Sequence, residues 1–213
     1  MNISTILNVS KMLRAINLAL ILIAMVLLGT HSLLHSLTLI IIAVVLLLIS
    51  TLLDNYVEKH GRKFEFVSEN MKKNIIAGIP FDKLPQRADK GSCGYDFYAP
   101  YNFTVKAGEQ MMIWTDIKVF MLENEVFILN VRSSQGKIKI RLANTQGWVD
   151  STYYNNEDNE GNIGILIENN GDKDYAVKVG DKFCQGMFLK YLTVGHDKPV
   201  NQKRLGGWGS SGK

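Results

Sequence analysis

The first 53 residues of this 213-residue chain contain no acidic residue and only two basic ones, Lys11 and Arg14. All 20 Asp and Glu residues, and 22 of the 24 Lys and Arg residues, therefore follow residue 53. An apolar N-terminal part and a polar remainder of this kind face different solvents. The distribution indicates a membrane-embedded segment joined to a water-soluble domain.

Cysteine is also scarce, because Cys93 and Cys184 are the only two and stand 91 residues apart. They form neither a disulfide framework nor a CxxC metal pair, and a reducing compartment is the simpler assumption. Beyond residue 53 the 22 basic and 20 acidic residues leave a net charge of only +2. This charge is too small to indicate a nucleic acid as a partner.

Two apolar runs, 15–29 and 33–53, are separated by three polar residues, 30–32, which directly follow Gly29. At about 1.5 Å per residue, the second run is long enough to cross the ~30 Å hydrocarbon core of a bilayer. Basic residues flank the outer end of each run, and such residues stay in the cytoplasm. We therefore expect residues 1–53 to form a transmembrane helical hairpin, with the rest of the chain on the cytoplasmic side.

A secretory signal is the rival interpretation of the first run. No A-x-A-like cleavage site follows residues 15–29, however, and a second apolar run does. Residues 54–79 are charged and interrupted by glycine, which predicts a juxtamembrane connector, with a short helix over 64–77 as the alternative.

Beyond residue 90 the pattern is that of short strands bounded by Gly, Asn and Asp turns. The clearest strand candidates are 126–129, 138–142, 163–167, 175–179 and 183–189. No helical period competes with them, and no Rossmann or P-loop glycine pattern is present. The fold class predicted for this part is all-β, as a sandwich or barrel-like domain.

Five stretches have more polar and glycine character than such a domain requires: GSCGYDFYA (91–99), VRSSQG (131–136), LANTQGWVDSTYY (142–154), VGDKFCQG (179–186) and RLGGWGSSGK (204–213). In this order they resemble the five motifs of the trimeric dUTPase family, over about residues 80–213. The resemblance implies a jelly-roll or β-clip domain over 80–203 and a flexible C-terminal lid over 204–213. It also implies a homotrimer that hydrolyses dUTP to dUMP and pyrophosphate with Mg²⁺, at sites built between subunits.

The resemblance assigns roles to residues of the third motif. Asp150 matches the general base that activates the attacking water, and Tyr153 matches the ring that packs against the deoxyribose. Asn144 matches the residue at the uracil edge, and Gly147, Trp148, Val149 and Gly164 complete that pocket. Outside the motif, Asp150 would be interpreted as a turn or capping residue.

The other motifs supply candidates for phosphate and metal. Phosphate contacts are implied for Arg132, Ser133, Ser134 and Gln185. In the lid, Trp208 would stack on uracil, and Gly209, Ser210 and either Lys203 or Arg204 would reach the phosphates. Asp96 matches an aspartate that lies near the magnesium through water, with the ion held mainly by the phosphates.

Two alternative functions stay open. A dCTP deaminase of the same fold superfamily would need a glutamate base, where this chain has Asp150. A nucleotide-binding regulatory module would bind the nucleotide at the same site without hydrolysing it. The acidic stretch 155–162 beside the third motif has no assigned role.

Overall fold

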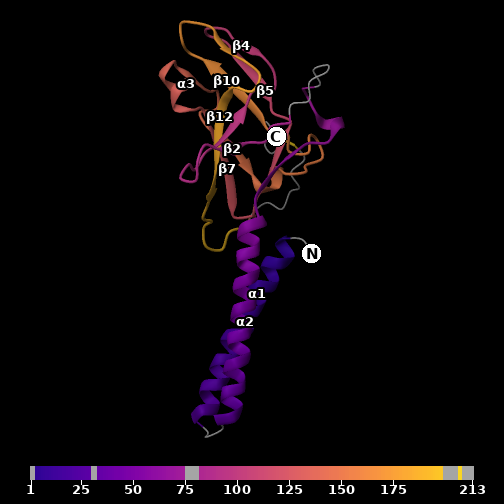
Figure 1. Ribbon diagram of the computed structural model, residues 1–213, viewed down its shortest axis with the longest axis vertical. Helices are drawn as coiled ribbons and strands as arrows, with labels where there is room; N and C mark the ends of the chain where they lie inside the picture. Colours follow the sequence, from indigo (N-terminus) through magenta and orange to yellow (C-terminus); the bar gives the residue numbers. More distant parts are fainter. Residues whose placement is uncertain (1–2, 30–32, 75–81, 199–205, 208–213) are drawn as a thin grey trace. The chain divides into compact units, whose positions relative to one another are not determined.

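The computed structural model describes residues 3–29, 33–74, 82–198 and 206–207 (Figure 1). The chain divides into two compact units, residues 1–62 and residues 63–213. The first unit is helical and the second is built from strands.

Two long helices make up the first unit, α1 (Ile3–Gly29) and α2 (Leu33–His60). Most side chains buried in this unit are small or polar and recur every seven residues: Ser10, Asn17 and Ala24 on α1, and Ser36, Ala43 and Ser50 on α2. Small side chains let two helix backbones approach closely inside a membrane. The Ser10 hydroxyl lies 3.2 Å from the Ser50 carbonyl and 2.6 Å from Oδ1 of Asp54, so polar groups also join the helices.

Large apolar side chains cover the outer faces of both helices, as Leu18, Leu48 and Leu52 are each at least 60% exposed. Residues Thr5–Val26 and His35–Val57 are long and apolar enough to cross a membrane. The prediction of two apolar helices is confirmed. Both helices extend beyond the apolar runs, and Arg14 of α1 forms an ion pair with Asp54 of α2.

The second unit contains twelve strands among the described residues, and every strand pair is antiparallel. The strands are β1 (Lys63–Phe66), β2 (Gln86–Arg87), β3 (Tyr95–Tyr98), β4 (Phe103–Val105), β5 (Gln110–Trp114), β6 (Ile117–Phe120), β7 (Glu125–Asn130), β8 (Ile140–Leu142), β9 (Gly147–Asp150), β10 (Gly164–Asn169), β11 (Tyr175–Val177) and β12 (Lys182–Lys190). The main sheet has the order β2-β3-β12-β7-β9, and a second sheet has the order β5-β10-β8. Two further pairs, β1-β6 and β11-β4, complete the unit. The predicted all-β domain is confirmed.

The core of this unit is aromatic and aliphatic, with Phe97, Phe127 and Phe183 fully buried. Gly186 of β12 lies against the Phe127 ring, where a Cβ atom at position 186 would stand 2.4 Å from Cζ. A glycine is therefore the residue that this packing admits.

The two cysteines have different surroundings. Cys93 is exposed, whereas Cys184 is buried among the core residues. The Cys184 thiol lies 3.1 Å from the Asn130 carbonyl oxygen. Burial raises the pKa of this thiol to about 12, because the thiolate would have to be desolvated.

The structure describes residues 54–74 of the segment expected to be a connector, 54–79, and part of this stretch has regular secondary structure. Its first residues continue α2 to His60, and residues Lys63–Phe66 form β1, which pairs with β6. The alternation of Phe64, Glu65 and Phe66 has the period of a strand, and both rings pack against the core. Of the short helix considered over 64–77, the structure describes residues 64–74, where it has β1 and a 3₁₀ turn, η1 (Glu69–Met71), instead.

Candidate functional site

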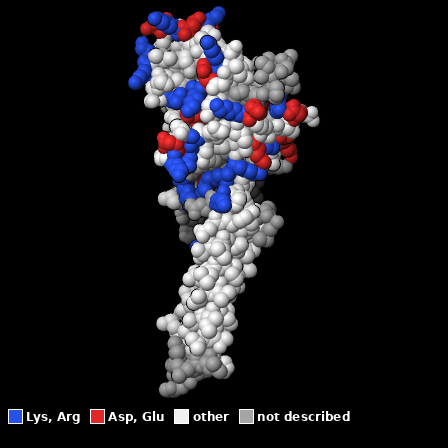
Figure 2. Space-filling model, viewed as in Figure 1, with Lys and Arg blue, Asp and Glu red and all other residues white. Residues whose placement is uncertain are grey.

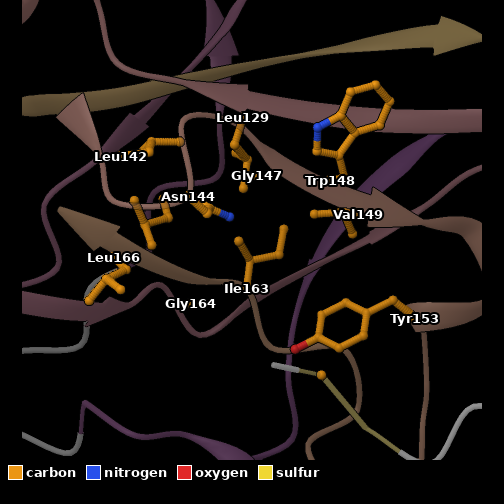
Figure 3. Close-up of a pocket in the computed structure, with 12 residues that line it drawn as sticks. Leu129, Leu142, Asn144, Gly147, Trp148, Val149, Tyr153, Ile163, Gly164 and Leu166 are labelled. Atoms are coloured by element: carbon orange, nitrogen blue, oxygen red, sulfur yellow. The ribbon is translucent and has the colours of Figure 1, made fainter. Parts of the chain in front are cut away.

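A pocket of about 180 Å³ opens between the edge of the main sheet and β10 (Figure 3). Its lining residues come from β7, β8, β9 and β10, from the segments between β8 and β10, and from the C-terminal part of the chain: Leu129, Leu142, Asn144, Gly147, Trp148, Val149, Tyr153, Ile163, Gly164, Ile165, Leu166 and Gly207. Six of them are residues that the sequence assigned to the uracil and deoxyribose pocket. The structure brings these six together in one chain.

Two glycines, Gly147 and Gly164, line the pocket wall and pack closely against neighbouring side chains. A Cβ atom on Gly147 would lie 3.0 Å from the Leu129 side chain, and one on Gly164 would lie 2.9 Å from Sδ of Met112. A side chain at either position would require these neighbouring side chains to shift. Both glycines are half-buried and line the pocket, so their main-chain groups could contact the amide and carbonyl edge of a ligand.

Asn144 lies in the turn after β8, and its side chain is directed toward the pocket (Figure 3). Trp148, on β9, also lines the pocket and remains 60% exposed. An amide presents both a donor and an acceptor, whereas an indole presents a large flat apolar surface. The pocket can therefore hold a planar ring that carries polar groups on one edge.

Tyr153 closes one end of the pocket and is only 7% exposed. It belongs to the 3₁₀ turn η2 (Ser151–Tyr153), directly after β9. Its hydroxyl donates to the Asn162 carbonyl at 2.8 Å and accepts from Nδ2 of Asn159 at 2.8 Å. The ring is thus held at its far end as well as at its backbone.

Gly207, near the C-terminus, lies against the same ring. A Cβ atom at this position would stand 2.9 Å from the hydroxyl oxygen of Tyr153. The next residue in the sequence is Trp208. Five candidates for the C-terminal lid lie outside the described residues: Lys203, Arg204, Trp208, Gly209 and Ser210.

A second group of predicted residues gathers around Asp96 on β3. Nε of Arg132 lies 3.0 Å from Oδ1 of Asp96, and Nζ of Lys182 lies 2.7 Å from Oδ2. Gln185 of β12 pairs in register with Asp96. Among these, Lys182 was not predicted from the sequence, although its place in the VGDKFCQG motif is a signal that could have found it.

The turn that carries Arg132 is held by a buried side chain, Gln135. Its Oε1 accepts from the Arg132 amide at 2.7 Å, and its Nε2 donates to the Phe183 carbonyl at 2.6 Å. Helix α3 (Ser133–Lys137) begins here and presents Ser133 and Ser134 to solvent. Gln135 is a further residue that the sequence interpretation missed.

Arg132, Ser133, Ser134 and Gln185 are not among the residues that line the pocket of Tyr153. Asp150 belongs to neither group and is exposed at the end of β9, one residue after the pocket residue Val149. Within one described chain, the predicted site is therefore divided into a ring pocket, a cationic turn and an exposed carboxylate.

The described residues contain no cluster of three or more His, Cys, Asp or Glu side chains that could hold a metal ion. Each carboxylate oxygen of Asp96 already accepts from a cation, Arg132 or Lys182. Magnesium requires six oxygen ligands in near-octahedral geometry. The described residues do not form such a site by themselves.

The known proteins that are similar to this chain belong to one family. The sequence model of the dUTPase family matches residues 82–212. A deoxyuridine 5'-triphosphate nucleotidohydrolase of Lactococcus lactis is 35% identical over 153 residues, which cover 71% of this chain and 97% of the relative. The corresponding protein of Swinepox virus is 32% identical over 133 residues, covering 61% and 89%.

Solved structures agree with this result. The crystal structure of the dUTPase from Streptococcus mutans is 30% identical with a TM-score of 0.51, and the match covers 62% of this chain and 98% of that one. A dUTPase of Staphylococcus bacteriophage 80alpha also has a TM-score of 0.51, and the match covers 72% of this chain and 99% of that one. At 20% identity this match shows a similar fold.

Proposed function

The chain belongs to the dUTPase family, and from this premise we propose that it hydrolyses dUTP to dUMP and pyrophosphate. The observation that carries the proposal is the pocket, in which Asn144, Gly147 to Val149, Tyr153 and Gly164 converge. Its volume of about 180 Å³ and its polar edge suit a pyrimidine ring and a sugar.

Uracil is recognised at the wall formed by β9, β10 and Asn144. Its O4 accepts and its N3–H donates, so an amide and neighbouring backbone groups can pair with both. Cytosine presents the opposite pattern and would leave these groups unpaired at a cost of about 1–3 kcal/mol. Gly147 and Gly164 support this role because both line the pocket and so bring main-chain groups to it.

Tyr153 faces the deoxyribose and excludes a 2'-hydroxyl. An apolar wall alone discriminates poorly against an added hydroxyl, by about a hundredfold, so the ring must also be rigid. The two hydrogen bonds at its hydroxyl support this role.

The triphosphate is bound by Arg132, Ser133, Ser134 and Gln185. A guanidinium fork, hydroxyls and consecutive amides suit phosphoryl oxygens. Because these residues do not line the pocket of their own chain, we propose that each site combines the pocket of one protomer with the cationic turn of another, in a homotrimer. From the C-terminus, Trp208 would stack on uracil, while Gly209, Ser210 and Lys203 or Arg204 would reach the phosphates.

Asp150 acts as the general base in this proposal. It accepts a proton from a water molecule, the water oxygen bonds to the α-phosphorus, and the bond to the bridging oxygen breaks to release pyrophosphate. Its position one residue after Val149, at the exposed end of β9, supports the role. Magnesium would enter with the phosphates that carry it, and when bound it would neutralise phosphate charge.

We further propose that α1 and α2 cross a membrane as a hairpin and leave the catalytic unit on the cytoplasmic side. The apolar outer faces and the small residues between the helices support insertion. Basic residues at both outer ends of the hairpin support the orientation.

A nucleotide panel with magnesium tests the proposed activity. We expect the full chain in detergent to release pyrophosphate from dUTP and to process dCTP, dTTP and UTP at least a hundredfold more slowly. Ammonia released from dCTP would indicate a deaminase instead. Tight binding of dUTP without pyrophosphate would indicate a regulatory module, and either result would contradict the proposal.

A further inference from the structure

The loop between η2 and β10, residues 155–162, buries three asparagines. Asn156 and Asn159 are each 5% exposed and Asn162 is fully buried. Buried amides are costly unless their donors and acceptors are paired. Such a loop is therefore built for a specific arrangement of hydrogen bonds.

These asparagines fix Tyr153 from two sides. At the ring, Nδ2 of Asn159 donates to the hydroxyl, and the hydroxyl donates to the Asn162 carbonyl, both at 2.8 Å. At the backbone, Nδ2 of Asn156 donates to the Tyr153 carbonyl, also at 2.8 Å. The loop thus sets both the direction of the ring and the position of its Cα.

Asn159 is itself held in one orientation. Its Oδ1 accepts from Nδ2 of Asn156 at 2.8 Å and from the Gly161 amide at 3.0 Å. With Oδ1 used in this way, Nδ2 must face the Tyr153 hydroxyl. Gly161 has a φ of +85°, and a Cβ atom there would lie 2.7 Å from the Tyr153 carbonyl oxygen, so the loop packs tightly on the tyrosine.

A segment that precedes the motifs braces the loop from outside. Glu160 accepts from the amide and hydroxyl of Ser68, at 3.0 and 2.6 Å. Nδ2 of Asn162 donates to Oδ1 of Asp116 at 2.9 Å, and the same carboxylate accepts from the Lys73 amide at 2.8 Å. The loop is therefore joined to residues 68–74 at two points.

We propose that Asn159 is a positioning residue for sugar discrimination, acting through the hydroxyl of Tyr153 while residues 68–74 keep its loop in place. The inference rests on the proposed function, in which the Tyr153 ring faces the deoxyribose. A ring that is held only by its backbone can tilt and admit a 2'-hydroxyl. A ring that is also fixed at its hydroxyl excludes it.

The test compares Asn159→Ala with Asn169→Ala in the full chain in detergent. Asn169 is a matched control, because it is fully buried and its Nδ2 donates to the Val105 and Lys173 carbonyls, at the other end of β10 from the pocket. The readout is kcat/KM for dUTP divided by kcat/KM for UTP. We expect Asn159→Ala to lower this ratio about fivefold to tenfold, the size of one lost hydrogen bond, and Asn169→Ala to leave it within twofold of wild type even if both variants lower Tm.

A double-mutant cycle with Tyr153→Phe locates the effect at the hydroxyl. In the phenylalanine background, Asn159→Ala should lower the ratio no further, since the hydroxyl that accepts from Nδ2 of Asn159 is already gone. An unchanged ratio in Asn159→Ala, or an equal loss in both backgrounds, would overturn the proposal while the proposed function stands. A wild-type chain that releases no pyrophosphate from dUTP would overturn the proposed function and this role with it.

Discussion

The two units of this chain distribute the same kinds of residue in opposite ways. In the helical unit, small and polar side chains such as Ser36 and Ser50 are buried and leucines face outward. In the strand unit, phenylalanines such as Phe97 and Phe127 are buried. Figure 2 shows charged side chains over the strand unit and few along the helices.

This inversion is what the proposed membrane hairpin would require, because burial in each unit would then follow the solvent of that unit. Between helices in lipid there is little hydrophobic driving force, so close packing and hydrogen bonds join them. In water, removing apolar area dominates, at about 25 cal/mol per Å². Because each unit has its own interior, we expect a change in one unit to leave the other intact.

The largest expected effect comes from removing residues 1–62. We expect residues 63–213 to move completely from the membrane fraction to the soluble fraction, because the exposed apolar helices are lost. Since this unit has its own core, kcat/KM for dUTP should stay within about twofold of the full chain. Sedimentation after alkaline carbonate extraction and a pyrophosphate assay would measure both, and a truncated protein that aggregates would contradict the division.

Asp150→Asn should remove the activity of the strand unit and leave both units folded. We expect kcat for dUTP to fall about a thousandfold, within the range for a lost general base, while the affinity for a non-hydrolysable dUTP analogue changes little. Calorimetry and pyrophosphate release would separate binding from turnover. Asp172→Asn is the control and should be fully active, because this carboxylate is exposed and does not line the pocket. Normal turnover in Asp150→Asn would rule out this base.

Gly186→Ala tests the packing of the strand unit. Because its Cβ would lie 2.4 Å from Cζ of Phe127, we expect the free energy of unfolding to fall by about 2–3 kcal/mol. Gly136→Ala is the matched control, since a Cβ there meets nothing within 4 Å. Denaturant unfolding of residues 63–213 would measure both. Equal stability of the two variants would show that the Phe127 ring can shift to accommodate a methyl group at position 186.

The smallest expected effect is at Glu160. The hydroxyl and amide of Ser68 lower its pKa from 4.5 to about 2. A lowered pKa stabilises the fold above the unfolded pKa, and this stabilisation is lost as the pH falls from about 4.5 toward 2. We expect Glu160→Gln to lower the free energy of unfolding by roughly 0.5–1 kcal/mol at pH 7, with the difference from wild type shrinking below pH 4.5.

Unfolding of the two proteins across pH 7 to 3 would measure this difference. Glu123→Gln, at an exposed position, is the control. A difference between wild type and Glu160→Gln that stays constant down to pH 3 would contradict the assignment to this carboxylate.

The ring pocket could be predicted from the sequence because most of it is local. Asn144 to Tyr153 follow one another within ten residues, so one motif carries them together. Lys182 and Gln135 were missed because their partners, Asp96 and the Phe183 carbonyl, are distant in sequence and become neighbours only through sheet pairing.

Weak local signals explain the remaining differences. The strand Lys63–Phe66 is too short for its alternation to outweigh the charged residues around it, and it is fixed by pairing with β6. The role of residues 155–162 could not be predicted because their composition indicates a different environment. Asn and Glu residues are typical of solvated loops, and only tertiary contacts reveal that Asn159 is buried.

The different exposure of the two cysteines allows the number of protomers in the assembly to be measured. A maleimide dye reacts with thiolate at an accessible thiol, so it should modify Cys93 and spare Cys184. Each chain would then carry one fluorophore without any engineered substitution. Counting bleaching steps in single detergent particles would give the number of protomers directly, and three steps would match the proposed trimer.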